Sequence, residues 1–383
     1  MTLWQMFCMT SIFFSAPYNF SPSHLQVMNT IRRMAPISRA SLAQHTGLSS
    51  ASVTNLTRDL IAHGLVQELG KLRGKKGQPA ITLGLVAQAG YSVGISPTFE
   101  ETVVVVTDFN GKLIGEERIA TDELTAVEET KEIRQRAEVL LAREGAREAD
   151  ILAVGVALPT TFSKQHDPAG QPVLQLSENF AARKDEDYVA QLSKVFDRPA
   201  KLENDANAAA SCEQLLGNSG NLTSFIYLFL GDGLGGSLIL NGTLWQGAHR
   251  NAGEIGAMMP PPAPRPTWAD LKMYLKEYGF EELTRTNFSE IAPLAEGPLK
   301  TWISRARTQL VELIYLSSSV LDPKGIVVGG TLPPELLERL AEGLPQAVAA
   351  RFGQSRLQIP DITLSQHAGA AASAFGAAAL GLN

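Results

Sequence analysis

The stretch LENDANAAA, residues 202–210, places an Asn-Asp pair where a strand pattern meets an alanine-rich helix pattern. The strand AKLEND is predicted to end at the carboxyl edge of a sheet, and the helix ANAAASCEQLLG to begin there. Open α/β sheets bind ligands at this edge, beside helix N-termini. Asp205 is therefore a candidate catalytic base or ligand contact, and its alternative is an N-cap carboxylate that accepts the first helical amides. For Asn204 the choice is between a ligand contact and a turn residue.

Strand and helix patterns alternate on both sides of this stretch. The segment at 91–121 predicts three strands joined by two turns, and the segment at 224–248 repeats that pattern. The other predicted elements are helices at about 124–144, 185–196, 299–320 and 368–380 and strands at 151–158 and 325–330. The recurrence indicates an internal duplication. The alternation predicts a two-lobed α/β body with a cleft between the lobes.

Residues 38–66 carry the pattern of a helix-turn-helix. Ser38 is predicted to cap a short helix, Gly47 to form the turn, and Ser49 or Ser50 to cap the second helix. Apolar residues of the second helix then face inward, namely Val53, Leu56 and Leu60. Its outward residues suit phosphate oxygens and base edges, and they are Ser50, Ser52, Thr54, Asn55 and Arg58. The pattern thus predicts a DNA-reading helix.

A basic loop between two strand patterns follows at 65–86. Arg73, Lys75 and Lys76 occupy its glycine-rich tip, which is typical of a wing that lies on phosphates or enters a minor groove. The alternative for the whole N-terminal stretch is a helical module that binds another protein.

The charge distribution is uneven. The chain carries a net charge of −6, but residues 24–86 contain eight basic and two acidic residues, which leaves −12 on the remainder. A basic domain fused to an acidic body indicates one polyanionic partner and one that is not. With only Cys8 and Cys212, the chain has neither a disulfide framework nor a zinc knot, which fits a reducing cytoplasm.

The N-terminal segment 1–22 is apolar and aromatic. No Lys or Arg precedes Arg32, so the basic region of a signal sequence is missing. We interpret the segment as a tail, a packing arm or the product of an early start codon, and we expect no membrane-spanning segment.

Four motifs resemble the ROK family, a group of repressors and sugar kinases on the actin-like (ribonuclease H-like) sugar-kinase ATPase fold. They are VGVALP (154–159), LENDANAAASCEQLLG (202–217), LFLGDGLGGSLILNGTLWQGAHRNAGEIG (228–256) and DPKGIVVGGTL (322–332). The resemblance implies that Asn204, Asp205 and Glu254 bind sugar hydroxyls, and that the Asp is the base in kinase members. The stretch LPTTF (158–162) departs from the usual Pro-Gly, so Thr160 and Thr161 are expected to reshape the pocket floor.

The resemblance also implies a domain organisation. We expect a winged helix-turn-helix at 23–87, a first lobe at 88–203 and a second lobe at 204–383, whose C-terminal helix packs back on the first lobe.

The nucleotide half of the family's site is altered in this chain. In kinases of this fold two glycine hairpins hold the ATP phosphates, and the first carries an Asp that serves the metal. Here Ser96 replaces that Asp, Pro97 removes an amide donor, and Glu100 and Glu101 would repel phosphates. The second hairpin keeps Gly231, Gly233, Gly235 and Gly236 but carries Asp232 in place of a hydroxyl residue. We therefore expect no ATP and interpret Asp205 as a vestigial base.

The family's zinc loop is altered as well. By the resemblance, Ala257 stands at the position of the family's sugar-contacting His, which precedes the zinc loop, and a proline run replaces the cysteine cluster. We expect no zinc and no other metal.

These features predict a DNA-binding transcriptional regulator of the repressor type. A catalytically silent sugar-kinase body would sense a sugar or sugar derivative, and a homodimer or homotetramer would bind a double-stranded operator. One alternative is an active sugar kinase with an appended DNA-binding domain. Another is a ligand-independent DNA-binding scaffold whose cleft has decayed.

Overall fold

The N-terminal module consists of three helices and a small antiparallel sheet. In the computed structural model, the described residues are 20–72, 80–121, 124–166, 172–176, 188–216, 222–260, 262–353, 355–367 and 369–380. The module's elements are α2 (Pro22–Met34), β1 (Ile37–Ser38), α3 (Arg39–Thr46), α4 (Ser50–Ala62), β2 (Val66–Leu72) and β3 (Ala80–Leu85), with strand order β1-β3-β2. Two consecutive helices followed by two antiparallel strands are the order that the sequence predicts for a winged helix-turn-helix, and that assignment stays a prediction.

The predicted turn chemistry of the module is confirmed. The Ser38 side chain accepts a hydrogen bond from the Ser41 amide at the start of α3, and Gly47 ends α3 with a φ of 70°. Of the two candidate caps for α4, Ser49 is the cap, because its side chain accepts from the Ser52 amide. Val53 and Leu60 are fully buried between the helices.

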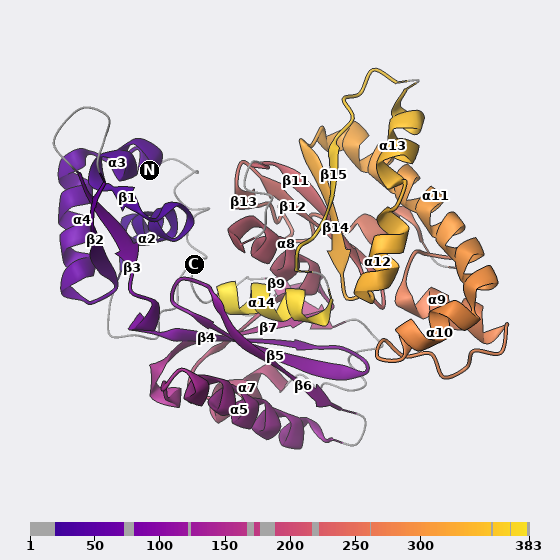
Figure 1. Cartoon of the computed structure of the whole chain (residues 1–383), viewed down its shortest axis with the longest axis horizontal. Coiled ribbons are helices and arrows are strands. Elements are labelled where there is room, and N and C mark those ends of the chain that lie inside the picture. Colours follow the sequence, from indigo (N-terminus) through magenta and orange to yellow (C-terminus); the bar gives the residue numbers. More distant parts are fainter. Residues whose placement is uncertain are drawn as a thin grey trace.

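Lobe 1 is built on a five-stranded sheet. Its strands are β4 (Tyr91–Pro97), β5 (Glu101–Asp108), β6 (Leu113–Ala120), β7 (Ile151–Leu158) and β10 (Ala200–Asn204), in the order β10-β7-β4-β5-β6. The helices α5 (Ala126–Arg143) and α7 (Tyr188–Val195) cover one face of this sheet (Figure 1). The hairpin of β8 (Thr160–His166) and β9 (Pro172–Leu176) follows β7.

Lobe 2 repeats the topology of lobe 1. Its strands are β11 (Phe225–Leu230), β12 (Leu234–Leu240), β13 (Thr243–Leu244), β14 (Gly325–Gly330) and β15 (Asp361–Leu364), in the order β13-β12-β11-β14-β15. In both sheets three antiparallel hairpin strands are followed by two parallel ones. The shared order supports the predicted duplication.

Helices fill the core of lobe 2. They are α9 (Trp268–Lys276), α10 (Phe288–Leu294), α11 (Glu296–Leu321), α12 (Pro334–Ala341) and α13 (Leu344–Phe352). Trp268, Phe288 and Trp302 from these helices are buried against β11 and β14. Sequence periodicity predicts α11 but not the other four helices, β8, β9 or β15.

Two helices of small residues join the lobes. The helix α14 (Ala370–Leu380) packs on β4, β5 and β7 of lobe 1 and on α8 (Asp205–Leu216), as Figure 1 shows. A Cβ atom added at Gly94 or Gly155 would lie 1.9 or 2.0 Å from a carbonyl oxygen of α14, so only glycine allows this approach. The joint brings the head of α8 to the carboxyl end of the lobe 1 sheet.

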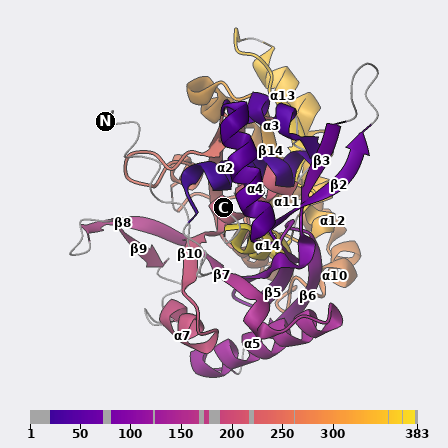
Figure 2. The same cartoon turned by 90° about the vertical axis from the view of Figure 1, so that its left-hand side faces the viewer.

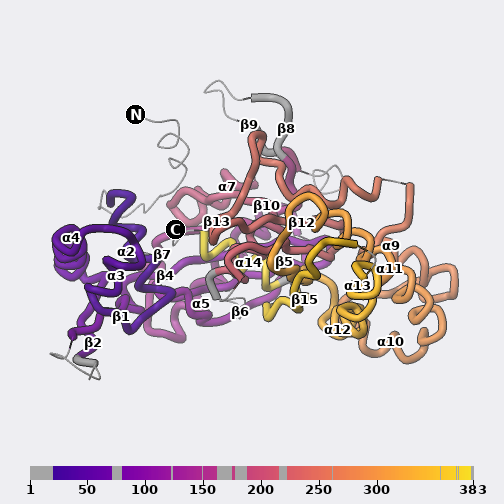
Figure 3. Tube along the Cα trace, turned by 90° about the horizontal axis from the view of Figure 1, so that it is seen from above, coloured from indigo at the N-terminus to yellow at the C-terminus, as the bar shows by residue number. Residues whose placement is uncertain are grey.

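The N-terminal module and the helices α9–α11 lie at opposite ends of the molecule (Figures 1 and 3), so the module is in front in Figure 2. Among the described residues, no helix is both long and apolar enough to cross a bilayer.

Candidate functional site

Asn204 is the cap of α8. Its Oδ1 atom accepts hydrogen bonds from the amides of Ala206 (2.9 Å) and Asn207 (3.0 Å), and its Nδ2 atom donates to the carbonyl oxygen of Thr160 (2.8 Å). The capping role that the sequence offers to Asp205 is thus carried mainly by Asn204. One N–H of the Asn204 side chain remains for a ligand.

Asp205 keeps an oxygen available. Its Oδ1 atom accepts from the amide of Ala206 at 2.9 Å, and within the described part of the chain its Oδ2 atom has no hydrogen-bond partner. The pKa of Asp205 is raised to about 7, mainly by burial; the amide of Ala206 opposes this shift, and the negative charges of Glu254 and Asp232 add to it. A carboxyl group that titrates near neutral pH is suited to accept a ligand hydroxyl or to exchange a proton with it.

Glu254 is held beside Asp205 by glycines. A Cβ atom added at Gly253 would lie 2.7 Å from the Gly236 carbonyl oxygen, and one at Gly256 would lie 2.2 Å from that of Leu234. The loop therefore lies directly on β12. Burial raises the pKa of the Glu254 carboxyl, although much of the side chain faces solvent.

A buried polar network supports the head of α8. Glu203 accepts from the Asn204 amide (3.0 Å) and from Asn207 Nδ2 (3.1 Å), and Ser237 Oγ on β12 donates to Asn207 Oδ1 (2.8 Å). We did not predict these contacts from the sequence, although Glu203 and Asn207 at i and i+4 flank the Asn-Asp pair and are a usable signal.

Thr160 has a supporting position. Its side chain is 3% exposed and its Oγ1 atom donates to the Leu158 carbonyl oxygen at 3.3 Å. The residue holds Asn204 through its own carbonyl, and a direct contact with a ligand stays a prediction.

The first hairpin turn uses its own amides. Thr98 Oγ1 accepts from the amides of Glu100 (3.3 Å) and Glu101 (3.1 Å), while the Thr98 amide donates to the Glu101 carbonyl oxygen (2.7 Å). Donors that a phosphate would require are thereby occupied inside the turn. The two carboxylates at this turn are compensated by cations, since Glu101 pairs with Arg118 and Glu100 with Lys272 and Arg285.

Two of the four glycines of the second hairpin have a packing reason. A Cβ atom at Gly231 would lie 2.6 Å from Thr331 Oγ1, and one at Gly236 would lie 2.6 Å from the Ile255 side chain. Gly235 lies against Ala206 of α8, whereas Gly233 faces open space. Packing thus accounts for two of the four glycines, Gly231 and Gly236, without any need for a phosphate.

The segment that replaces the zinc loop does not fit a zinc ion, because residues 257–268 contain neither Cys nor His. In the described ranges no cluster of three or more His, Cys, Asp or Glu side chains is arranged to hold a metal.

The outward residues of α4 lie on the surface. Ser50, Thr54, Asn55 and Arg58 are exposed and Ser52 is half-exposed. Arg58 donates to Asn55 Oδ1 on the same face of the helix. Arg73, Lys75 and Lys76 lie outside the described residues, so their place on the wing stays a prediction.

A two-lobed sugar-kinase fold that carries an N-terminal winged module defines a class of regulators and kinases. The ROK family matches residues 93–383, and the chain belongs to this family. The crystal structure of a ROK family transcriptional regulator, described as a homologue of the E. coli MLC protein, has a TM-score of 0.66 at 19% identity and covers 94% of this chain and 95% of that one. A ROK hexokinase from Thermus thermophilus has a TM-score of 0.53 at 21% identity and covers 76% of this chain and 97% of that one.

The named relatives by sequence are regulators. The xylose repressor of Caldicellulosiruptor bescii is 30% identical over 61% of this chain and 57% of its own length. The E. coli dual regulator NagC is 25% identical over 60% of this chain and 55% of its own. An uncharacterised protein of Sinorhizobium fredii is 29% identical over 80% of this chain and 77% of its own. The chain thus matches less than two thirds of the length of these named repressors.

Proposed function

We propose that this chain is a DNA-binding transcriptional regulator of the repressor type whose body senses a sugar or a sugar derivative. The observation that carries the proposal is the contrast between the head of α8 and the β4–β5 turn. At the head of α8, Asp205 Oδ2 and one N–H of Asn204 are available to a ligand beside Glu254. At the β4–β5 turn the amides and carboxylates are already paired within the protein.

Hydroxyl-rich ligands fit the first half. A sugar offers neighbouring hydroxyls that each donate and accept, a carboxylate accepts from two of them, and an amide does one of each. Phosphoryl transfer requires preorganised donors and a metal around the phosphates. The residues at the two turns do not fit that requirement, which favours a sensor over a kinase.

DNA binding is supported by the exposed polar face of α4 and by the repressor names of the relatives. A homodimer or homotetramer would place two modules on neighbouring half-sites.

The sensor and the kinase are separated by one set of assays. Purified protein is incubated with ATP, Mg²⁺ and a panel of sugars and sugar phosphates, while melting temperature and ADP are measured. We expect one class of sugar to raise the melting temperature, through binding to the folded state alone, with no steady ADP production. Sugar-dependent ADP production that Asp205→Asn abolishes would establish the kinase instead. If no sugar raises the melting temperature, the ligand-independent scaffold is favoured.

DNA binding is tested through its salt dependence. We expect the triple change of Arg73, Lys75 and Lys76 to Ala to weaken binding to all DNA sequences and to reduce the dependence of affinity on salt concentration. With fewer phosphate contacts, fewer counterions are released from the DNA on binding. Lys131→Ala, an exposed cation on α5, is the control. A salt slope that is equal in the triple variant and the control would contradict the wing assignment.

A further inference from the structure

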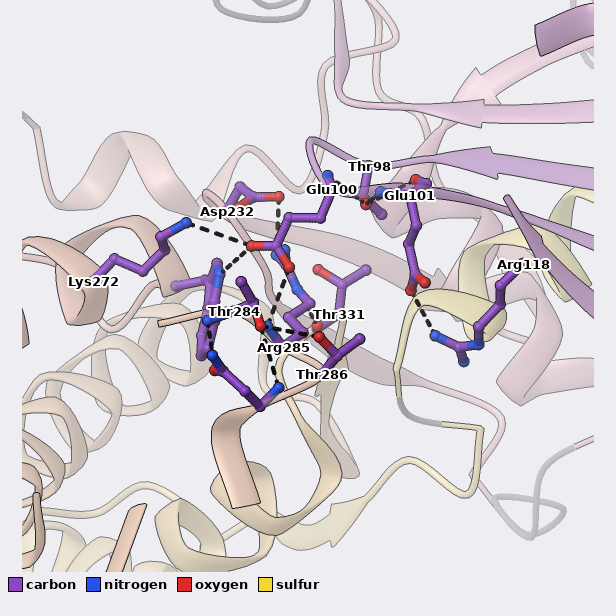
Figure 4. Close-up of polar contacts among 12 residues, drawn as sticks. Thr98, Glu100, Glu101, Arg118, Asp232, Lys272, Thr284, Arg285, Thr286 and Thr331 are labelled. Carbon is purple, nitrogen blue, oxygen red and sulfur yellow. Dashed lines mark hydrogen bonds and ion pairs between the residues drawn. The ribbon is translucent and has the colours of Figure 1, made fainter. Parts of the chain in front are cut away.

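Arg285 lies where three segments of the chain meet (Figure 4). Its Nη2 atom is 2.9 Å from Asp232 Oδ2 at the β11–β12 turn, and its Nε atom donates to the Thr331 carbonyl oxygen after β14 at 2.9 Å. Its Nη1 atom is 3.4 Å from Glu100 Oε1 at the β4–β5 turn. The guanidinium also lies over the Trp268 ring, 5.2 Å from its centre.

Glu100 is the member of this cluster that comes from lobe 1. Besides the ion pair with Arg285, its Oε2 atom accepts from the Arg285 amide at 3.1 Å and its Oε1 atom accepts from Trp268 Nε1 at 3.1 Å. Lys272 Nζ lies 3.6 Å from the same oxygen. All four contacts reach residues of lobe 2, so this one side chain connects the two lobes.

The electrostatics favour an ionised Glu100. Burial by itself raises the pKa of this carboxyl, but the hydrogen bond from the Arg285 amide and the positive charge of Arg285 outweigh burial, and the pKa lies below its ordinary value. Two carboxylates and two cations balance each other in the cluster. Burying such charges is tolerated when each is paired, and removing one partner leaves the others uncompensated.

We propose that Glu100 is an interlobe latch, a side chain of lobe 1 that holds the two lobes together through its contacts with lobe 2. Glu100 and Asp232 lie at the tips of the two turns that, by family resemblance, hold ATP phosphates in kinases, and Arg285 bridges them. An internal ion pair thus replaces a bound nucleotide as the connection across this side of the cleft.

The latch uses different residues from the other joint between the lobes. At that joint α8 and α14 pack through small residues close to Asn204 and Asp205. Two separate connections, one of them ionic and partly exposed, make closure adjustable by charge and salt. A regulatory role of the latch rests on the proposed function. A sugar that favours one arrangement of the two lobes would strengthen or oppose the contacts of Glu100.

Closure is measured as a distance between the lobes. Spin labels are attached at Val139→Cys on α5 and Leu294→Cys on α10, whose wild-type side chains are 49% and 73% exposed. Cys8 is changed to Ser, and Cys212 stays unlabelled because it is fully buried. Pulsed electron paramagnetic resonance then compares wild type, Glu100→Gln and Glu101→Gln in the full chain, without DNA or sugar.

Glu101→Gln is a matched control. It removes the same charge from the adjacent position, but Glu101 pairs with Arg118 inside lobe 1. We expect Glu100→Gln to give a longer mean interlobe distance and a broader distance distribution than wild type. We also expect hydrogen exchange at the Arg285 amide to be at least about tenfold faster. We expect Glu101→Gln to match wild type in both measurements. Distances and exchange rates that are the same in the two variants would overturn the latch.

A milder variant covers the case in which Glu100→Gln fails to fold. Lys272→Gln removes one cation from Glu100, and its side chain is 41% exposed. A shift in the same direction but smaller supports the latch, and an unchanged distance contradicts it. Since no sugar is present, a protein that shows the distance shift but binds no sugar retains the latch and loses the proposed sensing.

Discussion

Two adjacent residues at the head of α8, Asn204 and Asp205, have separate roles that the sequence does not distinguish. Asn204 caps the helix and Asp205 keeps one oxygen available. Sequence alone does not decide between them, because both are good caps and the choice depends on where the helix begins to within one residue. The positions were predictable, whereas their separate roles depend on the first helical hydrogen bonds.

Asp205 should impose a pH dependence on stability. Its pKa of about 7 in the folded chain lies above that of an unfolded aspartate, so the folded state holds a proton that the unfolded state releases. Wild type should therefore lose stability as pH rises from about 4 to about 7, by on the order of 1.4 kcal/mol per unit of pKa difference, and level off above it. We expect Asp205→Asn to lack this loss and to be the more stable protein at pH 8.

Urea unfolding at several pH values gives the free energy of unfolding of wild type and Asp205→Asn. The other carboxyl groups contribute equally to both proteins, so their effect cancels in the difference between the two free energies. Asp361→Asn, which removes an exposed carboxylate on β15, is the control. A stability difference between wild type and Asp205→Asn that does not change between pH 4 and pH 8 would show that the carboxyl is solvated like an ordinary one.

Glu100 shows a different limit of sequence reasoning. The sequence predicts that this turn repels phosphates, because it carries the carboxylates of Glu100 and Glu101. The compensating amide and guanidinium of Arg285 lie 185 residues further along the chain, in a loop between two helices that periodicity does not predict. Local patterns identify the altered turn, but only the tertiary fold identifies what pairs with it.

At the scale of elements, strong periodicity was a reliable guide. The hairpins of both lobes and the helices α5, α8, α11 and α14 lie close to their predicted positions. The short helices α9 and α10 escape prediction because they have nine and seven residues and α10 contains Pro293. Burial of Trp268 and Phe288 in the core of lobe 2 stabilises them instead.

The contact of α8 with α14 should be intolerant of even one methyl group. A Cβ atom at Gly376 would lie 1.8 Å from the Ala208 carbonyl oxygen, so the two helices would have to separate. We expect Gly376→Ala to lower the free energy of unfolding by about 1–3 kcal/mol, the usual cost of overpacking.

Gly297→Ala is the matched control, because Gly297 lies in α11 with no atom within 4 Å of the added Cβ. Alanine favours the helix there, and we expect a gain of up to about 1 kcal/mol. Denaturant unfolding of the two variants checks both signs. Equal stability of Gly376→Ala and wild type would mean that the interlobe joint can relax.

At the scale of the whole molecule, one strand lies between the proposed latch and the N-terminal module. β5 begins at Glu101, next to the latch, and ends at Asp108, next to Phe109. Phe109 is fully buried in the core of the module, together with Leu25 and Leu85, and its amide donates to the Ala87 carbonyl oxygen at 3.0 Å. The module is thus packed onto lobe 1, so a change in the lobes has a direct structural route to it.

Arg32 on α2 closes this junction. Its Nε and Nη2 atoms both donate to the Phe109 carbonyl oxygen at 3.4 Å, and its guanidinium lies over the Phe109 ring, 5.7 Å from the centre. Burial lowers the pKa of Arg32 to about 10, and the charge of Asp108 opposes that shift, so the side chain is still charged at neutral pH. Arg32 is one of the eight basic residues of 24–86, and in the structure it forms a contact between the module and lobe 1.

We expect Arg32→Met to uncouple the module from lobe 1. A charged hydrogen bond is lost while the apolar stem is kept, which should weaken the junction by about 1–3 kcal/mol. We expect wild type to unfold the module together with lobe 1 in one transition, and we expect calorimetry of Arg32→Met to resolve a separate, earlier transition for the module. Arg33→Met is the control, because Arg33 is exposed and donates to the Asn29 carbonyl oxygen of its own helix. If Arg32→Met and Arg33→Met both keep a single transition, the apolar packing of Phe109 alone couples the module to lobe 1, and Arg32 has no part in that coupling.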